Sequence, residues 1–340
     1  MSDRPGQTWI HAPFDSARNG LCCFLSRQRR VLPYFVCDKR CLTLQLGTTY
    51  IEDTFAEAFR MQAARLIVTA ADAFWLQAAI SEATGNATSV IGCDTEAGLE
   101  RVLSPEETLD GRPGAALLFF GMKPESLAVA VAARTGQSLL TCATTAVYDG
   151  LPDAQTRVPL GKQLRFFGDG FQKSKLVGGR RYWRIPVMDG EFIVEDTIGL
   201  AKGIAGGNMI LQARDQATAL AAVRRAIESV ADLPNVVLPF PGGAVRSGSK
   251  VGSRYKKLIA STNDTYCPTL VGRVDTSLED GATCAYEIVF DSLDEDSMIT
   301  AMRAAIAAAA GDGVLAITAG NYGGKLGKFH FHLREIVGSS

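Results

Sequence analysis

One glutamate in the C-terminal half of the chain has the surroundings of a chemical acid. Glu287 lies in a β-rich run, Cys284-Ala285-Tyr286-Glu287-Ile288-Val289-Phe290, and strand alternation places it on the face opposite Ile288 and Phe290. A carboxyl between apolar neighbours is costly to ionise, so its pKa should rise, and such a group can serve as a general acid. The pattern alone leaves two alternatives, an edge-strand glutamate that faces water and a buried partner of an arginine.

Two polar, glycine-rich stretches in the same half are candidates for ligand binding. The first covers residues 241–282, and the second, 319–327, lacks the Ser or Thr that follows the lysine of a Walker loop. Long loops of this composition usually bind something, although a solvated connector is the alternative. Lysines there would pair with carboxylates or phosphate, and asparagine amides would donate to a developing oxyanion. The candidate binding residues are Lys250, Ser261, Asn263, Asp264, Asn321 and Lys325.

Other chemistries find little support in the sequence. The 35 basic and 36 acidic residues leave no basic excess for nucleic acid, and no apolar run reaches the ~20 residues of a membrane span. Three histidines, no GxGxxG strand–turn–helix and no ligand cluster argue against a catalytic triad, a dinucleotide site or a metal. Four cysteines are scattered as in a reduced cytoplasmic core. Four others, Cys22, Cys23, Cys37 and Cys41, form no CxxC pair, so we interpret them as free thiols rather than a zinc site.

The elements that must position Glu287 belong to an internal repeat. Ile51-Glu52-Asp53-Thr54 recurs 143 residues later as Val194-Glu195-Asp196-Thr197. Each half then reads strand, helix, strand, strand, helix, strand, which is the order of a split βαβ unit. The sequence therefore predicts an α+β protein of two tandem ferredoxin-like lobes. The predicted elements are 64–70, 73–84, 88–93, 115–120, 125–134 and 138–141 in the first half, and 207–213, 217–230, 235–240, 283–290, 294–310 and 314–318 in the second.

The domain boundaries follow from this repeat. Residues 1–46 hold an excess of basic residues and short, interrupted apolar stretches, and we interpret them as a disordered extension or a start-site artefact. The N-terminal lobe should cover 47–189, including a hairpin-like bridge at 157–188, and the C-terminal lobe 190–338. The connection 96–114 in lobe one is about half as long as 241–282, and the counterpart of Glu287 falls near the apolar Leu117. The chemistry is therefore expected in lobe two.

Several collinear motifs resemble the formylmethanofuran–tetrahydromethanopterin N-formyltransferase family. The resemblance runs from about residue 47 to about 337 and leaves out the N-terminal extension. It rests on Tyr50-Ile51-Glu52-Asp53-Thr54-Phe55-Ala56-Glu57-Ala58-Phe59, Phe166-Phe167-Gly168-Asp169-Gly170, Gly190-Glu191-Phe192-Ile193-Val194-Glu195-Asp196, Pro239-Phe240-Pro241-Gly242-Gly243, Ser261-Thr262-Asn263-Asp264 and Gly320-Asn321-Tyr322-Gly323-Gly324-Lys325-Leu326-Gly327.

The resemblance implies a function and a set of partners. It implies reversible formyl transfer between methanofuran and N5 of tetrahydromethanopterin, without metal, nucleotide or a tightly bound cofactor. It also implies a homodimer or homotetramer with the coenzymes in a cleft at the subunit interface, and the family's proton-handling glutamate falls on Glu287. The balanced composition favours a methylotrophic bacterium, where the chain would work in a formyltransferase/hydrolase complex that oxidises formaldehyde to formate. The alternatives are a non-catalytic scaffold subunit and a transferase that uses a folate-type pterin.

Overall fold

The computed structural model describes residues 44–338. The interpretations of residues 1–43 and of the four cysteines there lie outside the described residues, whereas residues 44–46, assigned to the disordered extension, form a strand. The strands of the fold are β1 Leu44–Leu46, β2 Thr49–Ile51, β3 Phe55–Thr69, β4 Glu96–Leu103, β5 Gly114–Gly121, β6 Ala146–Asp149, β7 Thr156–Pro159, β8 Lys173–Val177, β9 Arg180–Val187, β10 Gly190–Glu195, β11 Thr197–Ala213, β12 Val236–Val237, β13 Lys250–Val251, β14 Ala260–Ser261, β15 Cys284–Ser292, β16 Val314–Thr318 and β17 Phe329–His332. The helices are α1 Ala73–Thr84, α2 Pro124–Arg134, α3 Gly161–Leu164, α4 Gln216–Val230, α5 Glu295–Ala309 and α6 Leu333–Gly338.

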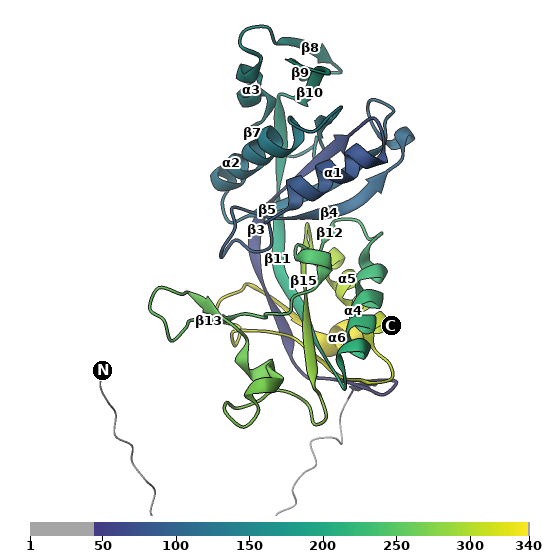
Figure 1. The fold of residues 1–340 in the computed structure, drawn as a ribbon, viewed down its shortest axis with the longest axis vertical. Coiled ribbons are helices and arrows are strands. Elements are labelled where there is room, and N and C mark those ends of the chain that lie inside the picture. Colours follow the sequence, from purple (N-terminus) through teal and green to yellow (C-terminus); the bar gives the residue numbers. More distant parts are fainter. Residues whose placement is uncertain (1–43, 339–340) are drawn as a thin grey trace, which may run out of the picture. The chain divides into compact units, whose positions relative to one another are not determined.

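The two lobes share one topology. In lobe one the antiparallel strands lie in the order β6-β3-β5-β4, and in lobe two the corresponding strands lie in the order β16-β11-β15-β12. The long helices α1 and α2 belong to the first sheet and α4 and α5 to the second (Figure 1). This is the ferredoxin-like arrangement that the repeat predicts, so the expected fold of two duplicated lobes is confirmed.

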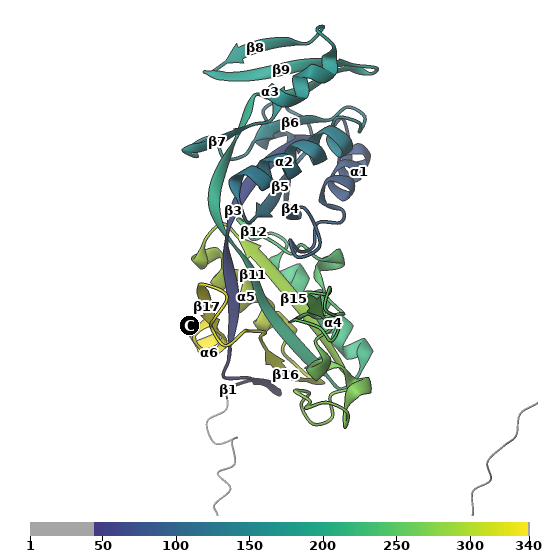
Figure 2. The same cartoon turned by 90° about the vertical axis from the view of Figure 1, so that its left-hand side faces the viewer.

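The two longest strands join the lobes into one sheet. β3 and β11 pair antiparallel from Ala201 opposite Ala63 to Ala205 opposite Phe59, and they run together between the lobes in Figure 2. Each of these two strands extends beyond the sheet of its own lobe into the other lobe. The start of β3 therefore pairs with β17 in lobe two, and the start of β11 pairs with β7 in lobe one. A bulge in β11 beside Gly206, whose φ of 85° suits glycine, ends the shared stretch.

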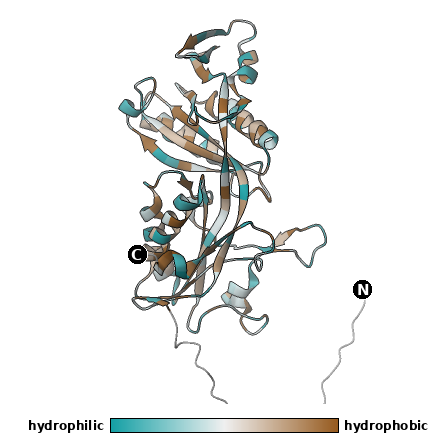
Figure 3. Cartoon of the chain, turned by 180° about the vertical axis from the view of Figure 1, so that it is seen from behind, coloured by the Kyte–Doolittle hydropathy of each residue, from teal (hydrophilic) through white to brown (hydrophobic). Residues whose placement is uncertain are grey.

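Helices and sheet enclose a separate core in each lobe. Leu66, Leu117 and Phe119 pack under α1 and α2, and Ile288 and Phe290 pack under α4 and α5. Figure 3 shows hydrophobic colours on strands and helices of both lobes. Aspartates 72, 215 and 294 cap the N-termini of α1, α4 and α5 with side-chain hydrogen bonds, which explains why these helices begin at or within one residue of the predicted starts. Because Ile288 and Phe290 of β15 point into the core, Glu287 lies on the sheet face away from the helices.

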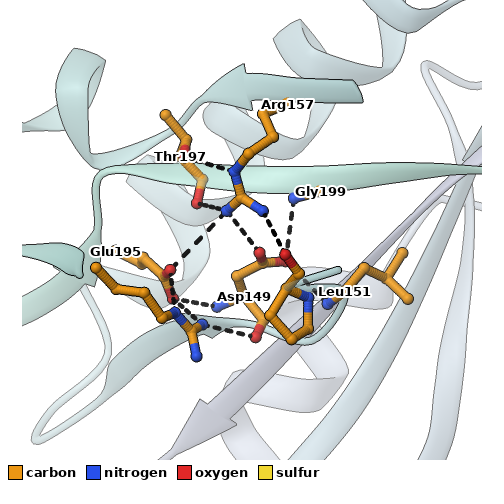
Figure 4. Close-up of polar contacts among 8 residues, drawn as sticks. Asp149, Leu151, Arg157, Glu195, Thr197 and Gly199 are labelled. Carbon is orange, nitrogen blue, oxygen red and sulfur yellow. Dashed lines mark hydrogen bonds and ion pairs between the residues drawn. The ribbon is translucent and has the colours of Figure 1, made fainter. Parts of the chain in front are cut away.

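A network of charged and polar groups fixes the bridge between the repeats to lobe one (Figure 4). The buried Asp149 carboxylate accepts from the backbone N–H groups of Leu151 and Gly199, at 2.9 and 3.0 Å, and pairs with Arg157 at 2.7 Å. Glu195, the repeat's second copy of Glu52, is 2% exposed and pairs with Arg180 at 2.5 Å. Buried carboxylates are tolerated here because each is both paired and hydrogen-bonded. The hairpin of β8 and β9 in this bridge matches the expectation.

Three element predictions were wrong or incomplete. Residues 88–93 form turns, and the strand comes later as β4, inside the stretch 96–114 interpreted as a loop. Residues 138–141 continue a π-helical turn, Thr135–Leu139, and the strand is β6 instead. The predicted strand 235–240 shrinks to the two residues of β12, because prolines at 239 and 241 cannot donate to a ladder.

Candidate active site

Glu287 lies in the middle of β15 with a neighbour on each edge. Ile210 of β11 is opposite on one side, and on the other Val245 exchanges two backbone hydrogen bonds with Glu287, at 2.7 and 3.0 Å. The side chain is largely buried, and the ion pairs found among residues 44–338 do not include it. Neither structural alternative, an exposed edge glutamate or the partner of an arginine, describes this carboxyl.

The surroundings of Glu287 favour its protonated form. Burial raises the pKa of the Glu287 carboxyl to about 7, against a smaller lowering by its hydrogen bond from the Asn208 side chain. Asn208 Nδ2 donates to Glu287 Oε1 at 3.1 Å, while Asn208 Oδ1 accepts from the N–H of Gly320 at 2.8 Å. The second bond fixes the orientation of the amide. A carboxyl with a pKa near neutrality can both give and take a proton, which is what general acid–base catalysis needs.

Two tyrosines lie close enough to this carboxyl to feel its charge. Burial and then the charge of Glu287 raise the pKa of the Tyr322 phenol. Burial also raises the pKa of the Tyr266 phenol, and the charge of Glu287 adds a smaller increase. Both phenols therefore stay protonated at neutral pH and can donate hydrogen bonds. A cavity of about 30 Å³ is lined by Glu287, Tyr266 and Asn263, among others. It has room for a group of a few atoms, and a larger ligand would have to lie mostly outside it.

The long loop 241–282 brings four predicted site residues together. β13 and β14 pair Lys250 with Ser261, and Lys250 Nζ forms an ion pair with Asp264 Oδ2 at 2.6 Å. Ser261 Oγ donates to the carbonyl of Gly252 at 2.8 Å. Asn263 lines the cavity of Glu287, and its Oδ1 accepts from Thr265 Oγ1 at 3.2 Å. This loop therefore presents an asparagine directly beside the acid and an ion pair further out.

The two predicted residues of the second loop behave differently. Asn321 Nδ2 donates to Thr54 Oγ1 and to the carbonyl of Phe55, at 3.1 and 3.2 Å, so its donors hold the loop to the start of β3. Lys325 is exposed on the loop surface. The sequence interpretation missed Asn208, Tyr266 and Tyr322. A polar residue in the apolar run 207–213 was the available signal for Asn208, and nothing local indicated the two tyrosines.

Lobe one has no matching acid. The register places Ile210 opposite Glu287, and its repeat partner Ile67 lies opposite Ala116. The counterpart of Glu287 is thus Ala116 and not Leu117, which faces the helices in the core. Counting from the helix start led to a neighbouring residue because the predicted starts, 125 and 294, each differ by one residue from the starts in the structure, Pro124 and Glu295. In the repeat the acid is specific to lobe two.

A larger cavity lies away from these groups. It has a volume of about 710 Å³ and is lined by parts of α1, β4, α4 and the stretch 236–243, without Glu287 or any predicted site residue. We centre the site on Glu287 because the chemistry lies there. Within the described part of the chain no three His, Cys, Asp or Glu side chains gather as metal ligands, and none of its helices is long and apolar enough to cross a membrane.

Comparison with known proteins identifies the family. The family model "Formylmethanofuran-tetrahydromethanopterin formyltransferase" matches residues 44–187, and the model "FTR, proximal lobe" matches residues 190–336. The chain belongs to this formyltransferase family. A formyltransferase of this name from Methylococcus capsulatus is 54% identical over 296 residues, which are 86% of this chain and 99% of that protein.

Two further relatives are informative. One subunit of a formyltransferase/hydrolase complex from Methylorubrum extorquens is 47% identical over 84% of this chain and 95% of its own. The crystal structure of that organism's complex with methylofuran contains a chain 46% identical to this one, with a TM-score of 0.84 and coverage of 87% and 99%. The Methanosarcina barkeri formyltransferase superimposes with a TM-score of 0.82 at 45% identity, covering 86% of this chain and all of the other.

Proposed function

We propose that the protein transfers a formyl group reversibly between formylmethanofuran and N5 of tetrahydromethanopterin. Family membership supports the reaction class, because relatives 45–54% identical over most of the chain carry this name. The single observation that carries the assignment to a site is Glu287, a largely buried carboxyl with a pKa of about 7 beside a small polar cavity.

In this proposal Glu287 donates and then recovers the proton that the transfer requires. N5 of the pterin attacks the formyl carbon, and the tetrahedral species places negative charge on the formyl oxygen. The C–N bond to methanofuran then breaks, and the leaving amine takes a proton from Glu287, while the proton lost from N5 restores the carboxyl. The Asn263 amide and the Tyr266 and Tyr322 phenols are donors for the oxyanion.

The loop residues are proposed to hold the coenzymes outside the cavity. Lys250 would exchange Asp264 for a coenzyme carboxylate or phosphate, and Lys325 offers a second cation from the other loop. Ser261 and Asn321 act through the backbone, because their hydrogen bonds keep their loops folded. From the family resemblance we propose a homodimer or homotetramer that binds the two coenzymes in a cleft between subunits.

The biological setting is proposed from the relatives. Because one of them is a subunit of a formyltransferase/hydrolase complex, we propose that this chain joins such a complex and serves formaldehyde oxidation to formate in the cytoplasm. Methanofuran and tetrahydromethanopterin would then be coenzyme substrates rather than resident cofactors.

A formyl-transfer assay with purified coenzymes tests the proposal. Wild-type protein, Glu287→Gln and the exposed control Glu295→Gln are mixed with formylmethanofuran and tetrahydromethanopterin, and 5-formyl-tetrahydromethanopterin is followed spectroscopically. Wild type and control should be active and Glu287→Gln strongly impaired. An inactive wild type would favour the scaffold subunit, and equal competition by tetrahydrofolate would favour the folate-type enzyme.

A further inference from the structure

The glycine-rich loop 320–327 is wrapped around a buried carboxylate of the chain itself. Glu57 in β3 is 1% exposed, and its Oε2 accepts from the backbone N–H groups of Tyr322 and Gly324 at 2.7 and 2.9 Å. Its Oε1 accepts from those of Leu326 and Gly327 at 2.6 and 2.5 Å. These are the donors that a loop of this composition would offer to a phosphate. The cradle is therefore filled by Glu57.

The glycines of the loop allow this close wrapping. Gly323 and Gly324 both adopt a φ of 70°, where glycine has no steric penalty. A Cβ on Gly327 would lie 2.5 Å from the carbonyl oxygen of Ala58 and 2.7 Å from Cγ of Glu57. Although burial opposes ionisation, the four backbone N–H groups hold the pKa of Glu57 below its ordinary value. The anchor therefore stays charged under the conditions in which the enzyme works.

Two interactions link this loop to Glu287. At its beginning, Gly320 donates to Asn208, and Asn208 donates to Glu287 Oε1. Two residues later, burial and then the charge of Glu287 raise the pKa of the Tyr322 phenol, and the Ser249 side chain hydrogen-bonds that phenol. Loop 320–327 thus orients the Asn208 amide that hydrogen-bonds the acid, and it carries a phenol on which the charge of the acid acts.

We propose that Glu57 is a positioning residue whose carboxylate holds loop 320–327 closed, and thereby keeps Asn208 and Tyr322 against Glu287 and water away from it. The proposal rests on the proposed function of Glu287 as the acid of formyl transfer. Its consequence is that this loop is a wall of the site and not an anion-binding nest for a coenzyme phosphate. The charged or titratable groups that line the cavity beside Glu287 are Arg246, Tyr266, Cys267 and Tyr286, and the charge of Glu287 also acts on Tyr322. Glu57→Gln leaves all of these groups in place, so wetting of the carboxyl should dominate any change in its titration.

Glu57→Gln tests the proposal against a matched control, Glu100→Gln. Glu100 is also a buried carboxylate that accepts a backbone N–H, from Asn235 at 2.6 Å, but it lies in β4 and pairs with Arg65. The pH midpoint of Glu287 protonation is measured without coenzymes from the infrared band of its protonated carboxyl. This band is assigned by its absence in Glu287→Gln. Glu57→Gln should lower this midpoint by about one pH unit or more and reduce kcat at least about tenfold. Glu100→Gln should leave both unchanged at a comparable loss of thermal stability.

A second variant covers the case in which Glu57→Gln does not fold. Gly327→Ala keeps the carboxylate but pushes the loop away from it, and it should lower the infrared midpoint in the same direction. A wild-type midpoint and kcat in a folded Glu57→Gln, or a wild-type midpoint in Gly327→Ala, would overturn the proposal. A wild-type enzyme without transfer activity would instead overturn the proposed function, while the infrared midpoints would still decide the role of Glu57.

Discussion

Replacing Glu287 by Gln should change the way the stability of the protein depends on pH. The Glu287 carboxyl has a pKa of about 7 in the folded chain and an ordinary value of 4.5, with burial as the cause. Below pH 4.5 both states hold the proton. Between pH 4.5 and 7 the unfolded chain releases it and the folded chain does not, so the contribution of this carboxyl to stability is lost as the pH rises through 7.

The size of this effect follows from the two pKa values. At about 1.36 kcal/mol per pH unit, the interval from 4.5 to about 7 corresponds to a loss of about 3 kcal/mol. Gln keeps the shape and can accept the hydrogen bond of Asn208 at every pH, so the variant escapes this loss. Urea unfolding of wild type and Glu287→Gln at pH 5, 6, 7 and 8 measures the difference. Parallel curves of unfolding free energy against pH would refute the idea that this carboxyl is buried and protonated.

Two predictions concern carboxylates elsewhere in the fold. Asp291, which is 0% exposed, and Glu96 both have raised pKa values, mainly because of burial, and Asp291 also because of the charge of Glu96. Asp291→Asn should therefore raise the melting temperature at pH 8 more than at pH 5; an equal change at both would speak against a shared buried site. Arg180→Met should cost roughly 3 kcal/mol in denaturant unfolding, because it leaves buried Glu195 without its closest cation. A loss below about 1 kcal/mol would show that the rest of the network in Figure 4 suffices.

The parts of the fold that local pattern controls were predictable from sequence. α1 and β16 begin and end at the predicted residues, and α5 begins one residue after its predicted start, where Asp294 caps it. β4 was missed because its buried Glu96 and Glu100 look like loop residues. The groups that make their burial tolerable, such as the Arg65 partner of Glu100, come from other strands.

The same distinction applies to the site. Strand alternation is local, so Glu287 could be singled out, and it proves to lie on the face away from the helices. The role of Glu57 depends on hydrogen bonds to residues about 265 positions later in the chain, which no short-range pattern contains. For Asn321 the residue type suggested a ligand donor, but its amide is engaged by Thr54 and the backbone of Phe55. The composition of the loops showed that they are unusual. It could not show which of their hydrogen-bond donors are already used by contacts within the chain.

The pH dependence of kcat for formyl transfer, measured for wild type and Glu287→Gln, tests the central claim most directly. If Glu287 is the acid, wild-type kcat from formylmethanofuran should fall as the pH rises through about 7, because the proton to be donated is lost. The kcat of Glu287→Gln should be lower by about 10² or more at pH 6 and should not show this fall above pH 7. A variant with the wild-type rate and the wild-type fall would contradict the account.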